Sequence, residues 1–525
     1  KAANTPPKVT VLSSDNLGTT FKVELSGFEL SNVNDNGRTY QHLDLMSGTF
    51  LSEKGNPALP FIANILAIPE QADLSIEVIE TGFVHSFSNV HIAPAVQSQW
   101  EGKPASAMVE NPETYSSKGI FPENLAAADP PSVFRDFRIA RVSVFPVRYL
   151  ASANEIRVAE SVTIRVNYSK GLSVNPKLTP RKKISPSFGK IYRSTILNYE
   201  EMLQMQYRGV EEGHDVMLCI MPDNFVTSFQ AYATWKRQSG IDIHITKFSD
   251  IGANATNPAP IKNHITDAYN NWENPPTYVL LVGDDGKFPK KIATYPDYSF
   301  PWDEYFVTVD GSDFMPDIMV GRFTNETDFT LKVMVNKFKQ YETAPYVSDP
   351  AWFKKGVCCS NNAYASQVYT KRIAANLMLN EGGFTSVDTL MSDGDFWTGT
   401  PCTYDLEDVT SAINEGRSYL NYRGEGWSSG WSANCYSFQT TDVTSLSNGQ
   451  KMPFVTSIGC GVAMFDASEG NCFGEEWVES GTLTSPKGAA CFIGPTSNTH
   501  TTYNNYIDRG IYVGMFREGL DTPGE

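Results

Sequence analysis

The hydrophobic pattern of this 525-residue chain changes near residue 214, and this change limits the folds that the chain can adopt. Before it, segments such as 21–30 and 137–150 alternate apolar and polar residues with a period of two, which predicts half-buried strands. After it, short apolar runs such as 278–282 alternate with segments of helical period such as 328–343. We therefore predict an all-β region followed by an α/β region with open, largely parallel sheets flanked by helices.

The predicted domain boundaries follow from this pattern. Residues 1–190 should form a β-rich domain of packed sheets, and residues 191–213 a linker. The remaining chain is long enough for two α/β subdomains, 214–345 and 346–525. The stretch 170–213 is rich in proline and basic residues and predicts an exposed, extended connector. Arg181, Lys183 and Arg208 in it would be open to a trypsin-like cut, although a plain interdomain linker explains the composition equally well.

Charge and hydropathy exclude several classes of partner. The net charge is −17 and the isoelectric point is about 5.0, which argues against nucleic acid or an anionic membrane as the main partner. The sequence contains no apolar run of about 18 residues, so we expect no transmembrane segment. It begins at Lys1 without a methionine or an apolar signal segment, and we expect a processed product that was secreted or displayed on the cell surface.

The eight cysteines all follow residue 210 and are too sparse for a disulfide scaffold. No C-x-x-C pair occurs and the seven histidines are scattered, which disfavours a zinc site. Cys402, Cys435 and Cys472 lie in polar, turn-rich surroundings, where two of them could form a disulfide.

One cysteine stands where α/β proteins place their functional sites. The apolar run 454–458 ends in Gly459-Cys460-Gly461, and an earlier predicted strand, 418–422, is followed by Gly424-Glu425-Gly426. Sites in open α/β sheets lie beyond the carboxyl ends of the strands. A cysteine nucleophile needs a base and donors for an oxyanion, and the amides of Gly424 and Gly461 could supply the donors. A buried cysteine that only fills the core explains Cys460 equally well.

Five separated segments carry a resemblance to the gingipain catalytic domain, a caspase-like cysteine peptidase. In order, they are 278–289 (YVLLVGDDGKFP), 316–323 (PDIMVGRF), 418–426 (SYLNYRGEG), 453–461 (PFVTSIGCG) and 488–498 (GAACFIGPTSN). The resemblance implies a caspase/gingipain-like α/β fold and a secreted bacterial endopeptidase that cleaves protein or peptide substrates through a Cys thiolate and an acyl-enzyme. It also implies that residues 1–190 are an inhibitory prodomain, released by cleavage near Arg208, Arg181 or Lys183.

Carried over by this resemblance, Cys460 is the nucleophile and Asp317 the acidic residue that orients the catalytic histidine, but Glu425 stands at the position of the histidine itself. A carboxylate cannot form the ion pair that an imidazolium gives a thiolate, and a nearby anion disfavours the thiolate. Three explanations remain open. The chain is an inactive homologue that acts as a binding or scaffold protein, or an engineered variant; Glu425 is the base, kept protonatable by burial and by Asp317; or His500 reaches the thiol. His500 could equally line the rim of the substrate pocket.

The resemblance also suggests pocket residues and a metal. Thr496 and Asn498 would line the substrate pocket, and Asp328 could pair with a basic P1 side chain, although an Asp at a helix start is ordinary. The P1 specificity stays open. No organic cofactor is expected, but gingipains carry structural calcium. Loop oxygens of the type that calcium prefers come from Asp284, Asp285, Asp303, Glu304, Asp310 and Asp313.

Overall fold

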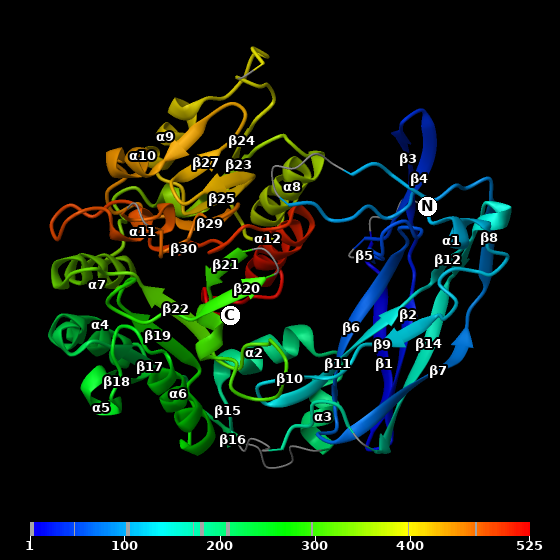
Figure 1. The fold of residues 1–525 in the computed structure, drawn as a ribbon, viewed down its shortest axis with the longest axis horizontal. Coiled ribbons are helices and arrows are strands. Elements are labelled where there is room, and N and C mark those ends of the chain that lie inside the picture. The colour runs from blue at the N-terminus through cyan, green and yellow to red at the C-terminus, as the bar shows by residue number, and fades with distance from the viewer. Residues whose placement is uncertain are drawn as a thin grey trace. The chain divides into compact units, whose positions relative to one another are not determined.

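The computed structural model describes residues 5–46, 48–100, 106–171, 173–178, 183–205, 211–295, 298–396, 398–467 and 470–525. The chain forms two compact units (Figure 1). The N-terminal unit comprises Lys1–Gln97, Ala105–Gly213 and Asp310–Asp317, and the C-terminal unit comprises Ser98–Pro104, His214–Val309 and Ile318–Glu525. The main division lies between Gly213 and His214, where the hydrophobic pattern of the sequence changes.

The N-terminal unit is built from antiparallel sheets. Its strands and short helices are β1 (Lys8–Asp15), β2 (Gly18–Glu24), β3 (Glu29–Asp35), β4 (Arg38–Asp44), β5 (Thr49–Phe50), β6 (Pro60–Ile68), β7 (Ala72–Thr81), β8 (Val84–Ser88), α1 (Pro112–Ser116), β9 (Ala126–Ala128), β10 (Ser132–Phe134), β11 (Phe137–Val144), β12 (Val147–Leu150), η1 (Ala151–Ala153), β13 (Glu155–Ala159) and β14 (Ser161–Lys170). The sheets run β1-β2-β14-β7, β10-β11-β6-β5 with β9 on β11, and β12-β13-β8, beside the β3–β4 hairpin. Alternate residues such as Phe21, Leu66 and Val142 are fully buried in one core, which confirms the predicted packed sheets.

The predicted exposed connector is wrong for residues 183–205 and 211–212, whereas residues 173–178 are irregular, with Val174 and Leu178 exposed. Residues 183–212 contain β15 (Lys183–Ile184), α2 (Pro186–Thr195), α3 (Tyr199–Met205) and β16 (Glu211–Glu212). The hydroxyl of Ser185 caps α2, and Phe188 and Tyr192 are buried against Phe134 and Phe137. The apolar face of α2 therefore belongs to the core of the N-terminal unit. Lys183 is half-buried in β15, whereas Arg181 and Arg208 lie outside the described residues.

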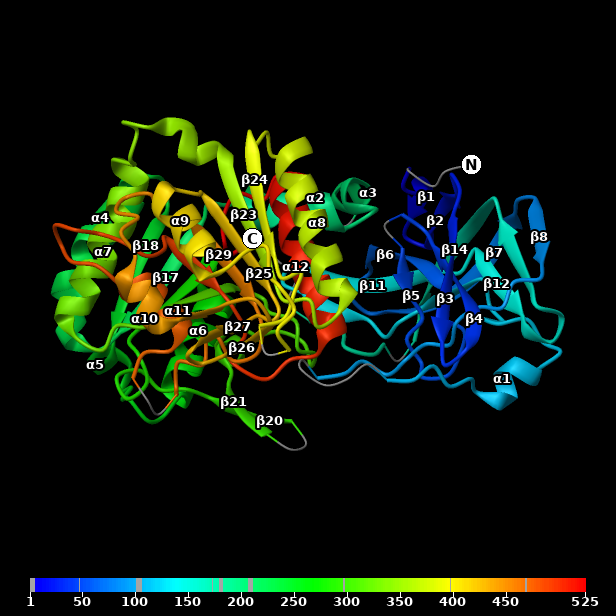
Figure 2. The ribbon, with the colours of Figure 1, turned by 90° about the horizontal axis from the view of Figure 1, so that it is seen from above.

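The first half of the C-terminal unit is a parallel sheet in the order β18-β17-β19-β22 (Figures 1 and 2). Its elements are β17 (Val216–Met221), η2 (Asp223–Phe225), α4 (Val226–Gln238), β18 (Asp242–Lys247), α5 (Phe248–Ile251), α6 (Ala259–Asn271), β19 (Tyr278–Val282), β20 (Ile292–Tyr295), β21 (Tyr298–Pro301), η3 (Asp303–Phe306), β22 (Met319–Phe323) and α7 (Asp328–Thr343). The N-cap of α7 is Thr327, whose hydroxyl accepts from the Thr330 amide.

The second half is a parallel sheet in the order β24-β23-β25-β29-β30. Its elements are η4 (Pro350–Lys354), β23 (Lys355–Ser360), α8 (Ala365–Asn380), β24 (Ser386–Met391), α9 (Leu406–Glu415), β25 (Tyr419–Arg423), β26 (Glu425–Trp427), β27 (Gly430–Ser432), β28 (Ser437–Gln439), α10 (Thr440–Ser445), β29 (Phe454–Ile458), α11 (Phe473–Glu479), β30 (Cys491–Ile493) and α12 (Thr501–Phe516). Helices α8 and α12 lie side by side over one face of this sheet (Figure 2). The two parallel sheets confirm the predicted α/β architecture. In the described parts of the chain, every helix is too short or too polar to cross a bilayer.

Candidate active site

The two strand ends singled out by the sequence are neighbours in the structure. Strands β25 and β29 pair in parallel, with Arg423 opposite Ile458. The backbones that follow the two strands stay close together, since a Cβ added to Gly459 would lie 2.6 Å from the carbonyl oxygen of Gly424. Glycine at position 459 thus permits the two backbones to approach. Glu425 and Cys460 therefore follow neighbouring strands at the carboxyl edge of the sheet, and Cys460 is buried.

The thiol of Cys460 contacts the loop that follows β30. The Thr499 amide donates a hydrogen bond to the sulfur at 3.4 Å, and the Thr499 hydroxyl lies 3.6 Å from the sulfur. That hydroxyl accepts a hydrogen bond from the Asn504 side chain at 2.8 Å, so its own proton can be directed at the sulfur. The Thr499 carbonyl lies 3.9 Å from the sulfur and can accept from the thiol, so the amide, hydroxyl and carbonyl of Thr499 all contact this sulfur. His500 is the next residue along this loop.

The two amides that were predicted to stabilise an oxyanion form hydrogen bonds within the fold. The Gly461 amide donates to the Ser497 carbonyl at 2.9 Å, and the Gly424 amide donates to the Ile458 carbonyl at 3.4 Å. In this structure both amides are hydrogen-bonded within the fold instead of facing a substrate. A role of Gly424 and Gly461 in an oxyanion hole therefore stays a prediction.

A fully buried arginine holds the loop in place. Arg423 ends β25, and its guanidinium donates to the Thr501 carbonyl at 2.9 Å, to the Asn505 side chain at 2.9 Å and to the Ile458 carbonyl at 3.4 Å. These bonds tie the first turn of α12 to the end of β29 and so fix Thr499 beside Cys460. Arg423 was not predicted as a site residue, although a charged residue that ends an apolar strand is a signal for such a role.

Glu425 is half-buried and begins a small antiparallel sheet formed by β26, β27 and β28. The Tyr422 hydroxyl donates to the Glu425 carbonyl at 2.6 Å. The Tyr422 ring stacks on Trp431 of β27, with ring centroids 4.3 Å apart, and the Trp431 indole donates to the Ser457 hydroxyl at 2.8 Å. The backbone of Glu425 is therefore fixed to both β25 and β29.

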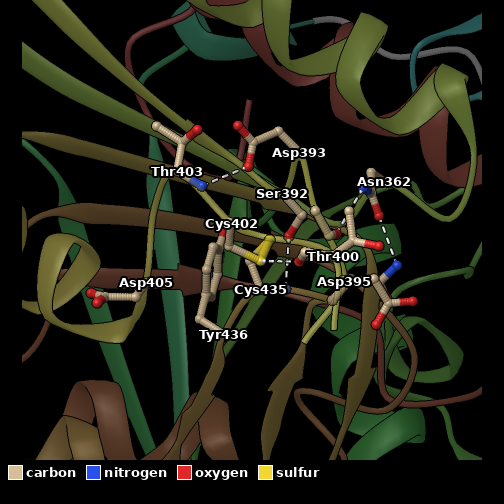
Figure 3. The surroundings of a disulfide bond; sticks show 12 residues. Asn362, Ser392, Asp393, Asp395, Thr400, Cys402, Thr403, Asp405, Cys435 and Tyr436 are labelled. Carbon is tan, nitrogen blue, oxygen red and sulfur yellow. Dashed lines mark hydrogen bonds between the residues drawn. A yellow bond between two sulfur atoms is a disulfide. The ribbon is translucent and has the colours of Figure 1, made fainter. Parts of the chain in front are cut away.

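A disulfide secures the far end of this small sheet. Cys402 bonds Cys435, which lies in the turn between β27 and β28 (Figure 3). The Asn434 side chain beside it donates to Asn362 at 2.7 Å. Two of the three predicted candidates thus pair, whereas Cys472 is buried with a free thiol. The bond joins the segment after β24 to the sheet that carries Glu425.

Thr496 and Asn498, which were predicted to line the substrate pocket, lie on the loop that follows β30. The Asn498 carbonyl accepts from the Tyr298 hydroxyl at 3.4 Å, and the Thr496 hydroxyl donates to the Pro301 carbonyl at 2.9 Å. Burial raises the pKa of Tyr298, and the charge of the Cys460 thiolate adds to the increase. Tyr298 thus lies within electrostatic range of the thiol, and strand β21 forms one side of the site.

Comparisons with known proteins decide the family. The sequence matches Peptidase family C25 over residues 211–525 and the C25 propeptide over residues 1–206. The chain belongs to Peptidase family C25. The resemblance to gingipains and the N-terminal propeptide region are thereby confirmed.

The curated relatives are peptidases of Porphyromonas gingivalis. Gingipain R2 is 26% identical over 94% of this chain and 65% of its own length, gingipain R1 27% over 86% and 44%, and a Lys-gingipain 25% over 92% and 27%. The chain therefore spans about two thirds of gingipain R2 and less than half of the other two. The crystal structure of the Arg-specific cysteine proteinase gingipain R matches with a TM-score of 0.51 at 22% identity, over 58% of this chain and 68% of that one. A complex of RgpB pro- and mature domains matches at 0.50 and 24%, over 56% and 67%, and both support the fold.

Asp317, placed by the resemblance at the acidic residue that orients the catalytic histidine, lies in the segment Asp310–Asp317 of the N-terminal unit. Its buried carboxylate accepts from the Asp310 amide at 2.8 Å and from the Arg135 amide at 3.3 Å. The Arg135 guanidinium also donates to the Asp317 carbonyl at 2.9 Å. In this structure the carboxylate therefore stabilises a turn of the N-terminal unit.

Asp328 is the first residue of α7. Its carboxylate accepts from the Ser228 hydroxyl and pairs with Lys332 at 2.7 Å, and the hydrogen bond from Lys332 lowers the pKa of Asp328. These are the contacts of an ordinary helix-start aspartate, and they give no support to a role in binding a basic P1 side chain.

The predicted calcium ligands are mostly engaged elsewhere. Asp303 pairs with Arg322 at 2.6 Å, Asp285 with Lys290 at 2.9 Å, and Asp310 with Lys177 at 2.6 Å. Asp313 accepts from the Val133 amide. Among the described residues, no group of three or more acidic, histidine or cysteine side chains is arranged to hold a metal ion. These contacts single out no set of calcium ligands among the candidates, and structural calcium stays a prediction.

Proposed function

We propose that this chain is the precursor of a gingipain-type cysteine endopeptidase in which Cys460 is the nucleophile. The observation that carries the proposal is the pair of Thr499 donors at the Cys460 sulfur. A cysteine that only fills a core has no need of such donors, whereas a nucleophile is activated by groups that favour its thiolate. The membership of residues 211–525 in Peptidase family C25 supports the same reaction class.

In the proposed reaction the Cys460 thiolate attacks the carbonyl carbon of the scissile peptide bond. The base has taken the proton of the thiol and gives it to the amine that the tetrahedral intermediate expels. Water then attacks the acyl-enzyme as the base takes its proton, which releases the carboxylic acid and regenerates the thiolate and the protonated base. We propose His500 as the base, because the residue before it contacts the sulfur and because an imidazole can exchange a proton with a thiol near neutral pH. Glu425 acting as the base is the alternative within the same reaction.

A second function is favoured by Glu425 itself. A C25 homologue with a carboxylate at the position of the family's histidine could have lost catalysis and kept peptide binding. In that case Cys460 and the loop around it would recognise a protein or peptide without cleaving it.

The N-terminal unit is proposed to act as the inhibitor of its own C-terminal unit until it is cleaved off. The match of residues 1–206 to the C25 propeptide supports this role. We also propose that the protein is exported from a bacterial cell. The disulfide between Cys402 and Cys435 supports export, since such bonds persist in oxidising compartments.

Four variants test these assignments. After limited digestion with trypsin, the parent chain should hydrolyse reporter peptides, and Cys460→Ala and His500→Gln should each lose at least about 100-fold in kcat/KM. Glu425→Gln should retain most of the activity if His500 is the base. Activity in the His500→Gln variant together with its loss in Glu425→Gln would assign the base to Glu425. Turnover by Glu425→His alone would identify a non-catalytic homologue, and no turnover by any folded variant would overturn the enzyme proposal.

A further inference from the structure

A tryptophan covers the face of His500. The indole of Trp100 stacks on the imidazole with ring centroids 3.9 Å apart and an interplanar angle of 35°. The edge of the same indole meets the ring of Tyr298 at 5.2 Å and 82°. Trp100 belongs by its contacts to the C-terminal unit, although Gln97 before it belongs to the N-terminal unit. One short stretch of chain therefore places its aromatic side chain between His500 and Tyr298.

The backbone of this stretch is held as a bound peptide would be. Trp100 forms an antiparallel bridge with His500, and the Gln99 carbonyl accepts from the Thr501 amide at 3.0 Å. Thr501 is the first residue of α12, and the first amides of a helix have no partner within the helix. A peptide carbonyl is a natural partner for such a donor. Main-chain pairing of this kind accepts any sequence, so that a side-chain pocket must supply the selectivity.

The aromatic rings around the indole supply a side-chain surface of this kind. His500 offers a ring face, Tyr298 a ring for an edge contact, and Tyr503, 59% exposed, continues the aromatic surface 5.7 Å from the imidazole. No carboxylate takes part in the contacts that the structure gives Trp100. Trp100 shows that this surface accepts an aromatic ring, and tilted or edge contacts between rings stabilise such pairs. His500, which carries the indole, directly follows Thr499, the residue that contacts the Cys460 sulfur.

We propose that His500, Tyr298 and Tyr503 form a substrate subsite for an aromatic side chain of an extended peptide, and that Trp100 occupies this subsite in the precursor. That the bound peptide is a substrate rests on the proposed function, whereas the binding of an aromatic side chain does not depend on catalysis. A bound peptide would give its carbonyl to the Thr501 amide and lay its aromatic ring on His500. Trp100 has to leave before such a peptide can enter.

Peptide binding to a chain that cannot turn over tests the subsite. The probe is an acetylated, amidated peptide with the sequence of residues 96–101, VQSQWE, together with versions carrying Ala or Lys in place of Trp. In the full chain with Trp100→Ala and Cys460→Ala, the Trp peptide should bind at least about tenfold more tightly than either other peptide. With Trp100 intact and Cys460→Ala, its affinity should fall by at least about tenfold, because the subsite is filled. Equal affinities for the three peptides, or tighter binding of the Lys peptide, would overturn the proposal.

A second measurement needs no added peptide. Hydrogen exchange of the Thr501 amide should quicken by at least about tenfold in Trp100→Ala and stay near the parent rate in Trp100→Phe, since only an aromatic ring keeps the segment seated. The same exchange rate of the Thr501 amide in all three chains would contradict the role of the Trp100 ring in the subsite. Neither measurement involves turnover, so each tests the subsite separately from the peptidase proposal. An inactive chain that still prefers the Trp peptide would possess the subsite as a binding site.

Discussion

The amide of Thr499 donates a hydrogen bond to the sulfur of Cys460 at 3.4 Å, and the hydroxyl of the same threonine lies 3.6 Å from that sulfur. The substitution Thr499→Val removes only the hydroxyl and keeps the shape of the side chain. The thiolate should become less stable, and alkylation of Cys460 by iodoacetamide at pH 7 should slow by about tenfold. Thr496→Val is the matched control, because its hydroxyl donates to the Pro301 carbonyl. Equal slowing in both variants would exclude a specific effect of Thr499 on the thiol.

Arg423 is predicted to position the loop that bears Thr499. Replacing it by methionine removes buried hydrogen bonds to the carbonyls of Ile458 and Thr501 and to the Asn505 side chain, and the free energy of unfolding should fall by about 2 to 3 kcal/mol in urea titrations. Alkylation of Cys460 should also lose its dependence on Thr499. The control Arg517→Met, at the C-cap of α12, removes a surface pair with Glu381 and should cost less than about 1 kcal/mol. A similar loss in both variants would contradict the positioning role.

The disulfide should stabilise the small sheet that carries Glu425. Cys402 and Cys435 are separated by 33 residues, and a closed loop of that length is worth about 3 to 4 kcal/mol in the chain-entropy account. The double variant Cys402→Ser/Cys435→Ser should lose stability of that order and exchange the amides of β26 and β27 faster. Reductant should have the same effect on the parent and none on the double variant. Unchanged exchange in β26 would show that the aromatic contacts alone hold this sheet.

Stability should depend on pH through Glu475 of α11. Burial raises the pKa of Glu475 above its ordinary value of 4.5, and a hydrogen bond with Asp284 raises it further. The folded chain therefore holds this proton more tightly than the unfolded chain. The resulting stability is fully present below about pH 4.5 and is lost as the pH rises toward the folded pKa, by about 1.4 kcal/mol per pH unit. Urea titrations at pH 5 and pH 7 should show a smaller decrease for Glu475→Gln than for the parent, and equal decreases would contradict this assignment.

Local sequence was enough to predict much of the α/β unit. Helix α7 and strands β19 and β29 have the predicted bounds, because their apolar spacing and the turn residues around them lie within or beside each segment. Strands β26 to β28 were not predicted, since each is three residues long and Trp431 and Phe438 find their burial only in the assembled core. Helix α2 was missed because its proline and basic residues resemble a linker, although Phe188 and Tyr192 lie on one face.

The candidate site was predicted in part. Glycines after two apolar strands were enough to bring Cys460 and Glu425 to one edge of a sheet. The contact of Cys460 with Thr499 joins residues 39 positions apart, and no spacing rule predicts it. The stacking of Trp100 on His500 joins parts of the sequence still farther apart. Arg423 was missed because its three partners come from β29 and α12.

The central claim is that Cys460 is an activated nucleophile, and covalent trapping tests it most directly. After limited digestion with trypsin, the folded chain is incubated with a peptidyl acyloxymethyl ketone, and the modified cysteines are located by mass spectrometry. The account predicts a single adduct on Cys460 that forms faster than alkylation of the urea-unfolded chain and is absent in Cys460→Ala. A folded chain whose Cys460 stays unmodified, while the unfolded chain reacts, would contradict the claim.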